Sequence, residues 1–166
     1  MIKQLLMCII LFHSQNCLGQ DSAITNSWEN LKTQLQRRTA IAISLTKSMS
    51  ASKSVDKKEL GNSKKIATDV LNYLDTLKKS DSLSIAMTGQ KNNDLKQALK
   101  KVLASAEGDR KYARQAEFMN LIAQFEGAEN RFVLARRQYN DVCKEHNRPD
   151  LKFLEQADAA AIKVEF

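Results

Sequence analysis

A three-four repeat of apolar residues near the end of the chain constrains its fold most strongly. The repeat consists of Phe118, Leu121, Phe125, Ala128, Phe132, Ala135, Tyr139, Val142 and His146. Steps of three and four keep side chains on one face of an α-helix, so the stretch predicts a long helix with one buried side. Large residues alternate with smaller ones, which lets neighbouring helices interlock. A helical core therefore explains the pattern without a cofactor, and Pro149 is expected to stop the helix.

A second repeat of the same kind lies in the first third of the chain. Its members are Ile24, Trp28, Leu31, Leu35, Arg38, Ala42, Leu45 and Met49. The spacing predicts a helix over about Ser22 to Ala51, capped at Asp21 or Ser22, with one charged residue, Arg38, on its apolar side.

The middle of the chain predicts further helices. One is expected to begin at a cap, Ser54 or Asp56, and to end at "LKKSDS", residues 77–82. The next is expected to restart at Ser80 or Asp81, to be broken or bent at Gly89, and to stop near Gly108. The chain has one proline and five glycines, which suits long helices better than sheets. The predicted fold class is all-α, an antiparallel up-down bundle of three to four long helices.

The first twenty residues have the layout of a signal peptide. Lys3 is followed by an unbroken apolar run over residues 5–12 and by a polar stretch that ends in Cys17-Leu18-Gly19. This run is too short for a spanning helix, which needs about 20 apolar residues, so we expect a leader over residues 1–20 that is cleaved. Lipidation at Cys17 and retention as an anchor are the alternatives. Residues 21–166 are then expected to form a single helical domain, with a short C-terminal segment after Pro149 that Asp150 can cap.

Cleavage would leave few reactive side chains. Only Cys143 and His146 would remain as thiol and imidazole, so the mature chain could form no intramolecular disulfide, and Cys143 is expected to be shielded on a helix face. Two ligands three residues apart do not make a metal site, and no metal is expected. The formal net charge is +7, which favours anionic surfaces without specifying one.

Several polar residues interrupt the apolar helices, and we interpret them as a structural network or an interaction face. The first and last helices of an up-down bundle are neighbours, so we expect Arg38 to meet Glu126 or Glu129. A buried ion pair of this kind fixes the register of two helices more than it stabilises them.

The sequence "ENRFVLARRQYND", residues 129–141, contains the rest of these polar residues. We expect Arg136 to reach Asn140 and Arg137 to reach Asp141, one helical turn away. Asn130 is assigned to the outer polar face, and Tyr139 is expected in the core with its hydroxyl bonded at the bundle edge.

The motifs of the common enzyme classes do not occur. The sequence has no nucleophile elbow, H-E-x-x-H, P-loop or Rossmann glycine pattern, and no Glu-x-x-His pairs of a di-iron bundle. We therefore expect no enzyme and no cofactor. The lysine pairs follow the outer faces of helices without interleaved aromatic residues, which argues against nucleic acid.

Two segments resemble the LemA family of bacterial proteins. They are "WENLKTQLQRRTAIAISLTKSM", residues 28–49, and "FMNLIAQFEGAENRFVLARRQYNDVCKEHNRP", residues 118–149, with "LKQALKKVLASAE" between them. The resemblance implies a long helical bundle at the bacterial envelope, in a family that usually has an N-terminal membrane segment and no established enzymatic activity. The leader here is shorter than that segment, and the tail after Pro149 lacks the family's usual ending.

These features lead to a ranked set of functions. The first is a non-enzymatic scaffold or interaction module, exported and periplasmic or membrane-associated, that presents a helical face to another envelope protein or to the membrane surface. The second is a basic module that binds anionic lipid or wall polymers, and the third is an enzyme with an unrecognised carboxylate site at Glu126 and Glu129. Homo-oligomerisation is left open.

Overall fold

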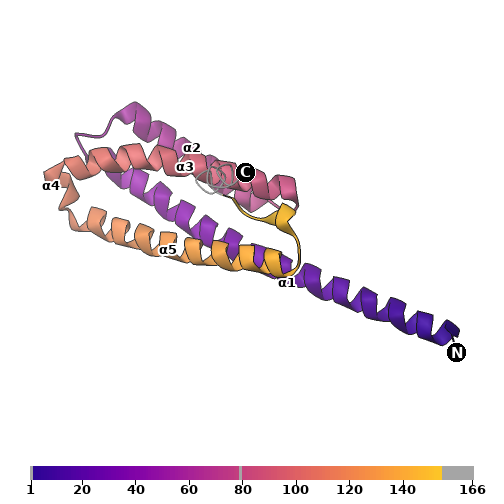
Figure 1. Cartoon of the computed structure of the whole chain (residues 1–166). Helices are drawn as coiled ribbons and strands as arrows, with labels where there is room; N and C mark the ends of the chain where they lie inside the picture. The colour runs from indigo at the N-terminus through magenta and orange to yellow at the C-terminus, as the bar shows by residue number, and fades with distance from the viewer. Residues whose placement is uncertain (1, 79, 155–166) are drawn as a thin grey trace, which may run out of the picture.

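The computed structural model describes residues 2–78 and 80–154, with side chains from residue 22 onward. The helices are α1 (Ile2–Ser48), α2 (Lys57–Thr76), α3 (Ser82–Gly108), α4 (Arg110–Ala113) and α5 (Ala116–Glu145), and short 3₁₀ turns are η1 (Met49–Ala51) and η2 (Pro149–Leu151). These described residues form an all-α bundle in which the long helices run alternately up and down (Figure 1). The predicted fold class is confirmed.

The four long helices do not close into a ring. α1 packs against both α5 and α2, and α2 packs against α3, so α1 is central to the bundle (Figure 1). α3 and α5 are instead joined at their ends, by α4 at one end and by η2 at the other. This arrangement leaves a seam between α3 and α5.

The apolar stripes of the sequence form the core. Every residue of the repeat from Ile24 to Met49 is buried, Arg38 included. In α5 the centre of the repeat from Phe118 to His146 is buried as well, through Phe132, Ala135 and Tyr139. Trp28 of α1 packs on Tyr139 with ring centroids 5.5 Å apart, which ties the two stripes together.

Aspartates begin two of the helices where the sequence predicted caps. The Asp56 carboxylate accepts a hydrogen bond of 2.9 Å from the N–H of Glu59 at the start of α2. Asp81 accepts one of 2.8 Å from the N–H of Ser84 at the start of α3. These carboxylates satisfy N–H groups that have no partner inside the helix, and they also suit the positive end of the helix dipole.

Two predicted boundaries are wrong. Helix α1 does not begin at Ser22 but runs from Ile2. The apolar run before Ser22 is also compatible with a helix, and Asp or Ser inside a helix lowers its stability by only about 0.5 kcal/mol each, which does not end it. The leader prediction and Cys17 fall on residues 1–21, whose side chains lie outside the described residues.

The second wrong boundary is the break at Gly89, because α3 runs unbroken from Ser82 to Gly108. Gly89 is buried, and a Cβ placed there would lie 2.7 Å from the carbonyl oxygen of Leu154. The glycine therefore serves a close approach between two segments rather than a bend.

Residues 149–154, here called the strap, fold back from α5 onto α3. Asn147 has a positive φ of 53°, and the N–H of Arg148 donates to the carbonyl of Cys143 at 2.7 Å. This is the left-handed ending that reverses a chain after a helix. η2 and the extended residues after it then lie beside Gly89, and residues 155–166 lie outside the described chain.

Candidate binding groove

The seam between α3 and α5 contains a groove with a volume of about 540 Å³. We call it the α3–α5 groove, and it is lined by Arg38, Lys96, Leu99, Lys100, Leu103, Ala104, Glu107, Phe125, Glu126, Glu129 and Asn130. Leu99 is buried at its base, and Leu103 and Phe125 are half-buried. The groove thus offers an apolar surface within a polar rim, which is the usual composition of a binding site.

Arg38 lies at the inner side of the groove and contacts residues of both α3 and α5. It is only 2% exposed, and its Nη1 donates to Oδ1 of Asn92 in α3 at 2.5 Å. Its Nε forms an ion pair with the Glu129 carboxylate in α5. Arg38 on the central helix therefore contacts both walls of the seam.

Two aromatic rings also contact the Arg38 guanidinium. Its Cζ lies 5.3 Å from the ring centroid of Phe132 and 5.5 Å from that of Phe125. A buried cation needs such compensation, because removal from water is costly unless hydrogen bonds, a counter-ion or ring faces replace hydration. The guanidinium thus has an acceptor in Asn92, a counter-ion in Glu129 and two ring faces within the protein.

The two walls of the groove differ in charge. Lys96 and Lys100 lie on α3, one turn apart, while Glu126 and Glu129 lie on α5. Glu129 is partly occupied by Arg38, with its side chain 29% exposed. The α5 edge of the groove is therefore acidic, whereas the α3 edge is basic at Lys96 and Lys100 and acidic at Glu107.

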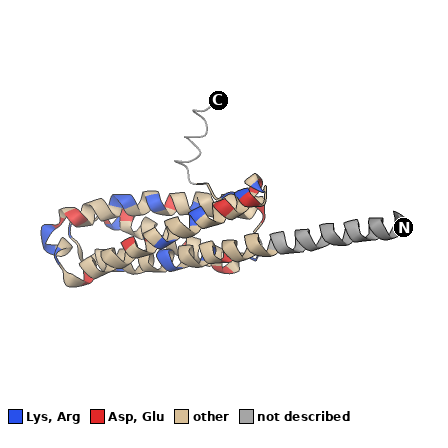
Figure 2. Cartoon of the chain, turned by 60° about the horizontal axis from the view of Figure 1, so that its bottom comes forward, with Lys and Arg blue, Asp and Glu red and all other residues tan. Residues whose placement is uncertain are grey.

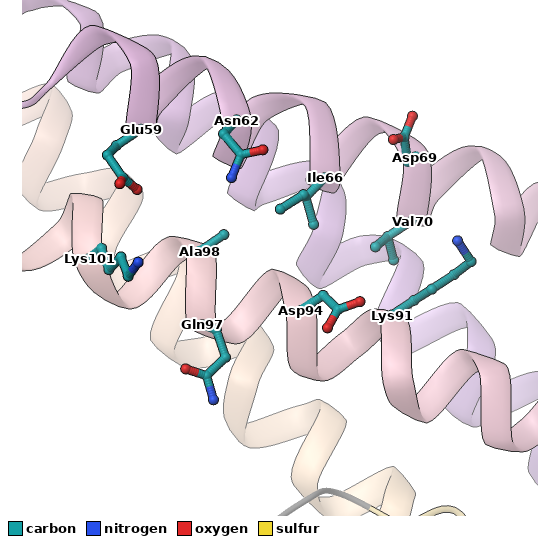
Figure 3. Close-up of a pocket in the computed structure, with 10 residues that line it drawn as sticks. All are labelled: Glu59, Asn62, Ile66, Asp69, Val70, Lys91, Asp94, Gln97, Ala98 and Lys101. Atoms are coloured by element: carbon teal, nitrogen blue, oxygen red, sulfur yellow. The ribbon is translucent and has the colours of Figure 1, made fainter.

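A second groove, of about 440 Å³, lies between α2 and α3 (Figure 3). Charged residues of both signs line it, among them Glu59, Asp94, Lys91 and Lys101. Lys91 reaches across toward α2, with its Nζ 5.1 Å from the ring centroid of Tyr73. This mixture of opposite charges is typical of a solvated seam between two packed helices, and we assign it no ligand.

The polar residues predicted as one network separate into two groups. Arg38 and Glu129 meet, and Glu126 and Asn130 line the same groove. Tyr139 and Asn140 contact the strap instead, near the other end of α5. The pairs Arg136 with Asn140 and Arg137 with Asp141 remain predictions.

Asn140, one of the polar residues singled out in the sequence, bonds the backbone of the strap. Its Nδ2 donates to the carbonyl of Phe153 at 3.1 Å, and its Oδ1 accepts from the N–H of Phe153 at 2.9 Å. The neighbouring Tyr139 is fully buried, as predicted, and its hydroxyl donates to the carbonyl of Leu151 at 2.7 Å. The Tyr-Asn pair therefore fixes the strap.

Sequence reasoning missed Asn92, the buried partner of Arg38. It is fully buried in α3 on the same side as Ile85, Leu95 and Leu99. A polar residue within an apolar stripe was the available signal, as it was for Arg38. The predicted break at Gly89 hid it, because a broken helix has no continuous stripe.

Cys143 is shielded, as predicted. It is fully buried, its thiol lies 3.8 Å from the Leu151 carbonyl, and burial raises the pKa of the thiol. A raised pKa keeps the sulfur as an unreactive thiol. Across residues 22–78 and 80–154, no group of three side chains that could hold a metal ion is found.

Comparison with known proteins identifies one family. The model of the LemA family matches residues 27–165, which is nearly the whole chain and extends past Pro149. No curated protein matches the sequence. Among the helices of the described residues, none has an apolar stretch long enough to cross a bilayer.

Proposed function

Since the chain belongs to the LemA family, we propose that it is a non-enzymatic protein of the cell envelope whose α3–α5 groove binds a helix of another envelope protein. The observation that carries this proposal is the seam itself, because within the described residues α3 and α5 approach each other less closely than the other neighbouring long helices do. In a closed four-helix bundle the two helices would cover the apolar surface that Leu103 and Phe125 leave exposed.

The charges of the two walls suggest the kind of helix that fits. A partner helix would place apolar residues on the base of the groove, acidic residues beside Lys96 and Lys100, and basic residues beside Glu126. Complementary charges at the rim contribute mainly to orientation and specificity, whereas the apolar contact supplies most of the affinity.

Three of the ionisable side chains are engaged by the protein itself, which fits a structural role for them. Arg38 is already paired with Glu129 and Asn92, and Cys143 and Tyr139 are packed against the strap. An enzyme needs a group that is free to exchange a proton or to attack a substrate. The predicted leader over residues 1–20 supports the envelope location.

Site-specific crosslinking in the native host tests the proposal. A photo-crosslinking amino acid is placed at Leu103 in the groove, and the same group at Leu134, an apolar residue of α5 that is 54% exposed outside it, is the control. We expect one discrete product from position 103, with the partner's crosslinked peptide forming an amphipathic helix. Equal products from the two positions, or a crosslinked peptide without helical amphipathicity, would contradict the proposal.

Charge reversal provides a second arm of the same experiment. Lys96→Glu with Lys100→Glu should weaken the product from position 103 by about tenfold, because two favourable rim pairs become repulsive. Lys64→Glu with Lys65→Glu on the exposed side of α2 changes the net charge equally and should leave the product unchanged.

A further inference from the structure

The strap runs along the seam between α3 and α5, in the direction of the α3–α5 groove. At its start the Asp150 carboxylate accepts a hydrogen bond of 3.3 Å from the Ser82 hydroxyl, in the first turn of α3. At its end the carbonyl of Leu154 lies against Gly89, about two turns further along the same helix. Figure 1 shows the strap, in yellow, turning back over the bundle from the end of α5. At Leu154 the chain is therefore directed along the seam toward the groove.

The strap already fills the first part of this seam with apolar side chains. Leu151 and Phe153 are buried in the core, and the ring centroid of Phe153 lies 6.0 Å from that of Phe132 in α5. The Phe132 ring also contacts the guanidinium of Arg38, which lines the groove. The part of the seam that the strap fills and the groove therefore meet at Phe132 and Arg38, so that the groove continues the path of the strap.

The spacing of the strap along α3 gives a register for the residues that follow it. Between its contacts with Ser82 and Gly89, four residues of the strap advance by seven residues of α3. An extended chain rises about twice as far per residue as a helix does, so this pitch is the one that extended backbone gives. If the pitch continued, residues 158–162 would pass residues 96–103 of α3, which include most of the α3 side of the groove.

The residue types in this register match those of the groove. Ile162 would come level with Leu103, whose apolar side chain is half-buried, and Asp158 would come beside the lysines of the α3 edge. Apolar and charged side chains alternate over residues 162–166, which lets extended backbone turn one side toward an apolar surface. Basic and acidic residues are interspersed along the described helices (Figure 2), so charge alone selects no surface and the apolar contact has to select it.

We propose that residues 155–166 occupy the α3–α5 groove of the same chain when no partner is bound. They would cover the apolar surface that Leu103 and Phe125 leave exposed. The LemA family model matches the chain up to residue 165, so the family pattern includes this segment. A partner helix would have to displace the segment, which would then regulate access to the groove. This regulation rests on the proposed function, whereas occupation of the groove by the segment does not.

Protection of a thiol in the groove tests the occupation in the purified full-length protein. Ala104, an exposed residue of α3 that lines the groove, is replaced by Cys, and its alkylation rate is followed by peptide mass spectrometry. We expect this rate to rise at least about threefold when Ile162→Ser, Val164→Ser and Phe166→Ser are added, because the apolar contact is lost. Ala123→Cys, at an exposed position of α5 that does not line the groove, is the matched control and should show no change.

A control within the segment separates the apolar contact from a general change in this part of the chain. Lys163→Ser with Glu165→Ser keeps the apolar residues and the net charge, and it should change alkylation at position 104 less than about twofold. Circular dichroism checks that each variant keeps its helical content.

Photo-crosslinking from the segment provides a second measurement that needs no thiol in the groove. A photo-crosslinking amino acid is placed at position 162 of the purified protein. We expect its product to join this position to residues 96–107 or 125–130, on the two walls of the groove. A mixture of isotopically labelled and unlabelled protein distinguishes a crosslink within one chain from a crosslink between two copies.

The regulatory consequence is measured in the native host. Adding the three apolar substitutions at positions 162, 164 and 166 should increase the partner's crosslinked product from position 103 about threefold, because the partner no longer competes with the segment. An unchanged amount of this product would contradict a regulatory role of the segment.

The outcomes in the purified protein are distinguishable. Faster alkylation at position 104 in the apolar variant alone, or a crosslink from position 162 to the groove within one chain, supports the occupation. Equal alkylation in the parent and the apolar variant, an equal effect of the charged control, or a crosslink only to another surface or to a second copy would overturn it. No partner protein is present in these measurements, so their failure leaves the proposed function standing. Conversely, the absence of any partner product from position 103 in the host would overturn the proposed function and leave the occupation standing.

Discussion

At the scale of single residues, Tyr139 and Asn140 give the strap the hydrogen bonds that regular secondary structure would otherwise provide. The strap has one short 3₁₀ turn and then extended backbone, so the carbonyl of Leu151 and both backbone groups of Phe153 need partners from elsewhere. Buried backbone groups without partners cost free energy, and two adjacent side chains of α5 remove that cost.

Replacing Tyr139 with Phe should reduce the free energy of unfolding by about 1–2 kcal/mol, because the buried Leu151 carbonyl loses its hydroxyl donor. Urea unfolding followed by circular dichroism measures the change. Tyr73→Phe is the matched control, since its hydroxyl bonds the Ser84 carbonyl at 3.2 Å in a half-buried position and should matter less. An equal loss in the two variants would refute the special role of Tyr139.

The partner of Arg38 could be predicted from the sequence, whereas the partner of Asn140 could not. A charge on an apolar stripe must have a partner, and the neighbouring helix has glutamates at the same level as Arg38. The partner of Asn140 is instead the backbone of a segment without any periodic pattern. A side chain that bonds the backbone of an irregular segment can have a partner of any residue type, so the sequence does not reveal the pair.

At the scale of elements, Asp109 organises the corner between α3, α4 and η1. Its carboxylate accepts hydrogen bonds from the N–H of Tyr112 at 3.2 Å, the hydroxyl of Ser52 at 3.0 Å and the N–H of Lys53 at 3.1 Å. One residue thus caps α4 and also holds the loop after α1. These donors, the N–H of Tyr112 first, lower the pKa of Asp109 from its ordinary value of 3.8.

This lowered pKa predicts a dependence of stability on pH. Because the folded protein binds this proton less readily than the unfolded chain, the contribution of Asp109 is present above pH 3.8 and is lost as the pH falls through the lower folded value. Asp109→Asn keeps the shape but does not titrate. The difference in free energy of unfolding between the parent protein and this variant should therefore shrink between pH 5 and pH 2, and a constant difference would contradict the assignment.

The elements themselves were largely predictable, because caps and stripes are local signals. Asp56 and Asp81 begin their helices as expected, and Pro149 follows the end of α5. Gly89 was misread since a glycine needed for close packing looks the same in sequence as one needed for a bend. Only the position of the distant Leu154 distinguishes the two.

At the scale of the whole molecule, α1 is both the centre of the bundle and the element that continues toward the leader. It contacts α2 and α5 and extends from Ile2 to Ser48. Among the residues of α1 whose side chains are described, the first in the core is Ile24. The buried stripe from Ile24 to Met49 therefore lies wholly after the expected cleavage site.

We expect the exported protein to be cleaved near Gln20 and to keep its fold. Intact-mass analysis of protein purified from the fractionated native host measures the site, and circular dichroism compares the mature and full-length chains. A mature mass in the soluble periplasmic fraction would confirm the cleavage prediction. An uncut leader in the membrane fraction, or a lipid on Cys17, would contradict it.

The seam between α3 and α5 is closed at both ends, by α4 and by the strap, and open only along its middle. A partner helix of the proposed kind would therefore enter the groove from the side and not through an end. From Lys96 to Glu107 the groove spans roughly three helical turns. Such a partner would need only a short internal stretch to fit, and its flanking sequence could carry domains of any size.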